Sequence, residues 1–147
     1  MKRFFLAIIV GGLCVSSTFA ELWEDYAPSE AVTELTVVAV EPNYLDDYIV
    51  RLERTWVRAA EVQKELGYIT NYAVWVSNNA DSPNVWLTMT YPNLASMTPD
   101  EKRWNKVNKE LEKRYGDDED ELEEIAKGYE EIRSIVDHAI LNQVEYR

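Results

Sequence analysis

Cysteine and histidine are almost missing from this 147-residue chain, which has one of each, Cys14 and His138. A single cysteine excludes an internal disulfide, and so small a set of potential ligands disfavours a transition-metal site. The chain also lacks a serine–histidine–aspartate arrangement, a glycine-rich phosphate loop and the ligand spacing of a zinc site. The sequence therefore predicts no catalytic residue, no metal and no cofactor.

Basic residues are scarce as well. The chain has 15 Lys and Arg against 27 Asp and Glu, a formal net charge of −12. A surface of this charge repels phosphate backbones, so we expect no nucleic-acid partner. The densest acidic stretch, Asp117 to Glu124, has Leu122 where a calcium loop needs its glycine. We interpret the stretch as the solvated start of a helix, with loose calcium binding as the alternative.

A hydrophobic run long enough to span a membrane is missing too. The apolar stretch Phe4 to Val15 is shorter than the ~20 residues that a spanning helix needs. It follows a basic start and precedes small residues at positions 18 and 20, which is the layout of a secretory signal peptide. The sequence predicts a signal peptide over 1–20, cleaved near Ala20, and a periplasmic or secreted protein with no membrane anchor after cleavage. An uncleaved anchor is the alternative.

After the signal peptide we expect an acidic N-terminal arm at 21–32 and one domain at 33–147. β-Branched or alternating segments predict strands at 33–41, 68–77, 85–91 and 140–146. Apolar residues spaced by three or four predict helices at 44–66, 98–116 and 118–138, with His138 at the end of the last one. A lone histidine there is typical of a surface residue. The order of elements predicts an α+β fold of the ferredoxin-like split βαβ type, an antiparallel sheet with its helices on one face.

The two strands at 68–77 and 85–91 each carry a tryptophan, Trp75 and Trp86. Alternation places Val74, Val76, Val85, Leu87 and Met89 on the drier side of the hairpin, which we assign to the helices. The tryptophans then share the face without helices. If Ser77 pairs with Asn84, the two indoles lie directly opposite one another. The predicted interaction residues on this face are Asn71, Trp75, Trp86, Thr88 and Thr90.

A face with two indoles among Thr, Asn and Ala is too apolar to remain bare and too polar for the core of a single chain. We expect it to form a homodimer or a pocket for a small aromatic or apolar ligand. The alternative is that the C-terminal segment or the arm that carries Trp23 folds over it.

The long first helix that ends in Leu-Gly, the aromatic hairpin and the stretch TYPNLASMTPDEKRW (90–104) resemble the dimeric α+β barrel superfamily, which includes NIPSNAP-like and antibiotic-biosynthesis-monooxygenase-like domains. The resemblance implies a homodimer in which two sheets enclose a cavity. Some members use this cavity for oxidation or haem degradation, the latter with an Asn–Trp–His set. This chain has Asn71 and Trp75 on the predicted face, but its only histidine, His138, departs from that pattern.

Three functions follow as hypotheses. The first is an exported, non-catalytic domain that dimerises through the tryptophan face. The second, implied by the resemblance alone, is a cofactor-poor oxygenase or a haem-handling enzyme. The third is a structural partner in an envelope complex that uses the acidic helices.

Overall fold

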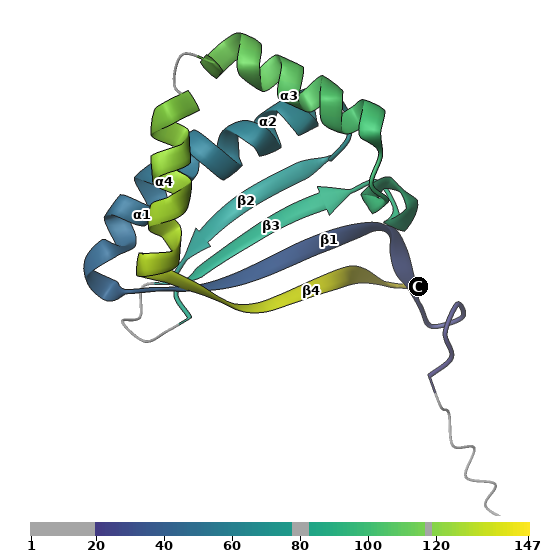
Figure 1. The fold of residues 1–147 in the computed structure, drawn as a ribbon. Helices are drawn as coiled ribbons and strands as arrows, with labels where there is room; N and C mark the ends of the chain where they lie inside the picture. Colours follow the sequence, from purple (N-terminus) through teal and green to yellow (C-terminus); the bar gives the residue numbers. More distant parts are fainter. Residues whose placement is uncertain (1–19, 78–82, 117–118) are drawn as a thin grey trace, which may run out of the picture.

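The protein is an α+β domain in which one four-stranded antiparallel sheet carries a layer of helices. The computed structural model describes residues 20–77, 83–116 and 119–147. Residues 1–19 of the predicted signal segment, the turn of the hairpin and the first two residues of the acidic run lie outside the described residues. Figure 1 shows the helices gathered on one side of the sheet, while the other side carries none.

The sheet has the strand order β2-β3-β1-β4, and every neighbouring pair is antiparallel. The strands are β1 (Tyr26–Val40), β2 (Asn71–Val76), β3 (Val85–Tyr91) and β4 (Arg133–Tyr146). The two long strands β1 and β4 lie side by side, so β4 forms one edge of the sheet (Figure 1). This architecture is consistent with a ferredoxin-like class.

Helical segments connect the strands. They are η1 (Pro42–Tyr44), α1 (Leu45–Leu52), η2 (Glu53–Val57), α2 (Arg58–Glu65), η3 (Leu94–Met97), α3 (Glu101–Tyr115) and α4 (Glu119–Ile132). The segment η2 is a π-helical turn inside the predicted long helix, and Gly67 ends that helix with a φ of 75°. Glycine suits this left-handed conformation because it has no Cβ to clash with the backbone.

The core lies between the sheet and the helices. The sheet contributes Val38, Val40, Val85 and Leu87, and the helices contribute Tyr48, Leu52, Tyr129 and Ile132. Burial of such side chains supplies the main driving force of folding. A hydrogen bond joins the π-helical turn to α4, where the hydroxyls of Thr55 and Tyr129 lie 2.7 Å apart.

One end of the β1–β3 ladder is completed by a side chain. Asn84 is 3 % exposed, and its amide donates a hydrogen bond to the carbonyl of Val40 and accepts one from the Val40 amide. The two distances are 2.8 and 2.9 Å. The Asn84 side chain therefore takes the place of a backbone partner for Val40, and it satisfies two backbone groups that water cannot reach.

The main differences from the predicted elements concern the edge strand and its neighbour. The predicted last helix, 118–138, stops at Ile132, and the chain continues as β4 from Arg133, so His138 lies on a strand and not at a helix end. The apolar spacing in this region fits a helix, but pairing with β1 decides the structure because it satisfies a whole row of backbone groups. For the same reason β1 begins at Tyr26, inside the predicted arm, since β4 is long enough to pair with it there.

Candidate functional site

The side of the sheet without helices carries three rows of paired residues. Strand pairing makes the residues of one row neighbours on the same face. The rows are Trp75–Trp86–Val37–Asp137, Ala73–Thr88–Leu35–Ala139 and Asn71–Thr90–Thr33–Leu141. We call these twelve residues the open face. It contains all five residues that the sequence predicts, and β1 and β4 add members that the hairpin pattern does not reveal.

The two tryptophans lie directly opposite one another, as the predicted register requires. The amide of Ser77 donates to the carbonyl of Asn84 at 2.9 Å, and the next pairs inward bring Trp75 beside Trp86. Trp75 remains 59 % exposed. Its indole N–H donates to the hydroxyl of Thr88 at 3.4 Å, which leaves the ring faces available for contact.

Hydroxyl and amide groups occupy the far row of the open face. The hydroxyls of Thr33 and Thr90 are 3.0 Å apart and satisfy one another. Asn71 lies at the β2 edge, where its side-chain oxygen accepts a hydrogen bond from Lys64 at 3.4 Å. Polar groups that are already paired are less costly to cover, because burial then removes no unsatisfied donor or acceptor.

Charge is nearly absent from the open face. Asp137 is its one charged member, whereas the whole chain has 27 acidic and 15 basic residues. The cores of protein interfaces are depleted of charged residues and enriched in aromatic ones. The open face therefore has fewer charged residues than the rest of the molecule, as expected for a surface that a binding partner covers.

The described part of the N-terminal arm does not cover the open face. It turns beside the C-terminus, where the Arg147 side chain donates to the carbonyl of Trp23 and the Arg147 amide donates to the carbonyl of Asp25. Trp23 is itself 57 % exposed. The C-terminal segment is β4, which widens the sheet and leaves its face bare. Neither segment buries the tryptophan pair.

Apolar exposure continues along the edge strand. Half or nearly half of the surface of several large side chains of β4 is open to solvent; these are Ile135, Val136, Ile140, Leu141 and Val144. Proteins usually protect a long edge strand with charges, prolines or a covering segment. The β1–β4 pairing has register irregularities between Pro28 and Val32 and between Val37 and Val38, and β4 carries the charged residues Asp137 and Glu145.

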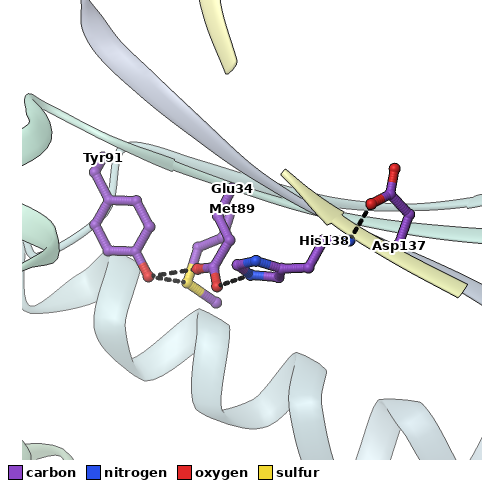
Figure 2. A network of polar contacts seen from close by, with 5 residues as sticks. All are labelled: Glu34, Met89, Tyr91, Asp137 and His138. Carbon is purple, nitrogen blue, oxygen red and sulfur yellow. Dashed lines mark hydrogen bonds and ion pairs between the residues drawn. The ribbon is translucent and has the colours of Figure 1, made fainter. Parts of the chain in front are cut away.

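A polar network lies on the other side of the sheet, facing the helices (Figure 2). The Glu34 carboxylate accepts a hydrogen bond from the Tyr91 hydroxyl at 3.1 Å and lies 2.8 Å from Nε2 of His138. The Tyr91 hydroxyl also lies 3.1 Å from the sulfur of Met89. Burial, with the nearby negative charge of Glu34, raises the pKa of Tyr91 to about 12, so this hydroxyl stays protonated and donates.

This network was not found from the sequence, because its members come from β1, β3 and β4 and only strand pairing brings them together. It orients the His138 ring through a carboxylate, an arrangement that many enzymes use to position a base. Tyr91 also lines a cavity of about 550 Å³ between α2 and α3, but Glu34 and His138 do not line it. The imidazole therefore lies outside the cavity that its network reaches.

The Asn–Trp–His set implied by the resemblance does not come together within one chain. Asn71 and Trp75 lie on the open face, whereas His138 pairs with Thr36 and points to the helix side, toward Glu34. Over residues 20–77, 83–116 and 119–147, no group of three or more His, Cys, Asp or Glu residues is placed to hold a metal ion. Among the described helices, none is both long and apolar enough to cross a membrane.

Comparison with known proteins returned nothing: no protein-family model, no curated protein and no solved structure matches this chain.

Proposed function

We propose that this protein is an interaction domain that forms a homodimer through the open face. The supporting observation is the composition of that face: eleven of its twelve residues are uncharged in a chain of net charge −12, and they include the exposed Trp75 beside the half-buried Trp86. A second copy of the chain is the partner that such a surface fits best. In a two-fold interface each patch meets itself, so a patch rich in charges of one sign would repel its own copy.

The size of the sheet supports a dimer of ordinary stability. The strands have 15, 14, 7 and 6 residues. With about 3.3 Å per residue and about 4.8 Å between strands, they give the face a plan area of roughly 650 Å². A standard interface buries about 800 Å² per partner. The side chains that project from the face, such as the exposed Trp75 and Leu141, add area beyond this plane and bring the two values closer together.

The proposal also covers the detailed topology of the fold and the cellular location of the protein. We propose the ferredoxin-like split βαβ arrangement, which the strand order β2-β3-β1-β4 supports. We also propose that the protein works in the periplasm or outside the cell, supported by the signal-like layout of positions 1–20. Two twisted sheets do not touch over their whole area, and a small aromatic or apolar molecule fits between the indole pairs of two copies.

The decisive experiment measures mass by light scattering over a dilution series. We expect a dimer for the natural protein and a shift to monomer for Trp75→Ala with Trp86→Ala. A tryptophan that acts as an interface hot spot typically contributes about 2 kcal/mol or more, so the loss of both should weaken the dimer Kd at least about 100-fold. Trp104→Ala is the matched control, because Trp104 is an exposed tryptophan on α3. A natural protein that stays monomeric at tens of micromolar contradicts the proposal.

A further inference from the structure

Asp137 is the one charged residue of the open face. Its Cα partner on β1 is Val37, which is buried, and it completes the row that contains both tryptophans. On its own strand the next residue of the same face is Ala139, and the exposed Leu141 follows it. Figure 2 shows the Asp137 carboxylate on the opposite side of β4 from the His138 imidazole. The carboxylate therefore lies at the β4 edge of the open face, in the same row as the two tryptophans and next to the buried Val37.

No cation compensates this carboxylate in the part of the chain that the structure describes. Its carboxylate accepts a 2.8 Å hydrogen bond from the backbone amide of His138. In the monomer, water solvates the remaining oxygen. A dimer that covers the open face removes this water from two carboxylates at once. An ionised carboxylate without a partner is costly to bury, and a group in that position takes up a proton instead.

We propose that Asp137 makes self-association depend on pH, so that the dimer tightens as the pH falls and the two carboxyls become protonated. This inference rests on the homodimer proposed above and assigns the regulation of its interface to one side chain. The sign follows from linkage: the dimer binds more protons than two monomers, so acid favours the dimer and alkali favours the monomer. Asp137 thereby also limits unspecific association of an otherwise uncharged face at neutral pH.

The row of the open face that contains Asp137 holds no second titratable group. Val37 and Trp86 face it from β1 and β3, and neither titrates. His138, which follows Asp137 in the chain, contacts Glu34 on the helix side of the sheet. The general acidity of the chain is a second contributor, since two copies of net charge −12 repel one another less as their carboxylates become protonated.

The experiment measures the dimer Kd by sedimentation at pH 8, 7, 6 and 5 and constant ionic strength, with Asp137→Asn as the test variant. Asp47→Asn changes the net charge equally, on α1, far from the face, and Asp47 is exposed. His138→Gln removes the neighbouring imidazole. For the natural protein we expect a Kd at least tenfold tighter at pH 5 than at pH 8. Asp137→Asn should be at least tenfold tighter than the natural protein at pH 8 and nearly independent of pH.

Asp47→Asn and His138→Gln should keep the pH dependence of the natural protein. If Asp137→Asn behaves like Asp47→Asn, repulsion between whole chains explains the effect and the assignment to Asp137 is wrong. A dimer with the same Kd at every pH overturns this inference and leaves the homodimer standing. Monomers at every pH, for the natural protein and for Asp137→Asn alike, overturn both.

Discussion

Replacement of Asn84 tests whether one buried amide connects the hairpin to the rest of the sheet. Asn84→Ala removes both hydrogen bonds to the Val40 backbone. Val40 is 2 % exposed, so water cannot replace the lost partners. An unsatisfied buried donor or acceptor costs about 1–3 kcal/mol. We therefore expect the free energy of unfolding to fall by about 2–4 kcal/mol, a large part of the stability of an ordinary domain.

The assay is urea unfolding followed by circular dichroism at one protein concentration, so that self-association contributes equally to each variant. With a denaturant slope of about 2 kcal/mol per molar, the midpoint should fall by about 1–2 M. Asn105→Ala is the control, because Asn105 is exposed in the middle of α3 and its replacement should change stability by less than about 0.5 kcal/mol.

Asn84→Asp sharpens the test because it keeps the shape of the side chain. Aspartate can still accept from the Val40 amide, but at neutral pH an ionised oxygen would face the Val40 carbonyl where the amide now donates at 2.8 Å. We expect this variant to lose at least as much stability as Asn84→Ala. A loss below about 1 kcal/mol in both variants would refute the reasoning, since it would mean that the Val40 backbone finds other partners at little cost.

Two further predictions concern the backbone and the network of Figure 2. Gly67 has a φ of 75° and open space around its Cα, so a Cβ added there meets backbone strain but no neighbouring atom. Gly67→Ala should therefore lower the stability measured by thermal unfolding by about 1 kcal/mol. The control is Gly116→Ala, which should cost nothing because Gly116 has a right-handed helical conformation. Because the pKa of Tyr91 is raised to about 12 in the folded state, the stability that it contributes is full below pH 10 and is lost as the pH rises through 12. The free energy of unfolding should fall over that range, and Tyr91→Phe should reduce the fall by about 1–2 kcal/mol, allowing for solvent screening; an equally steep fall in the variant would contradict the role of Tyr91.

The hairpin and its tryptophan pair could be predicted from the sequence. Alternation along a strand has a period of two, so the side of each residue follows from its neighbours, and one assumed pair, Ser77 with Asn84, sets the whole register. The five predicted residues are accordingly found on one face. That they form an interface remains a prediction, which the dilution experiment tests.

The edge strand could not be predicted with the same information. Ile132, Val136 and Ala139 recur at helical spacing, and the local pattern favours one long helix. In the structure the chain leaves α4 at Ile132, where the Glu41 amide donates to the Ile132 carbonyl, and then pairs with β1 along its length. That pairing satisfies the backbone hydrogen-bonding groups at the edge of β1, a strand about a hundred residues away in the chain. A pattern read from neighbouring residues does not contain this contribution.

The sequence by itself determined the acidic surface, the amphipathic helix that ends at Gly67 and the side of the hairpin on which each tryptophan lies, because each of these depends on neighbours along the chain. The tertiary structure alone decided that His138 meets Glu34 and that Val37 and Asp137 join the tryptophan row. The physical reason is that pairing between distant strands is selected by hydrogen bonds and burial of the whole sheet. These exist only once the chain has folded.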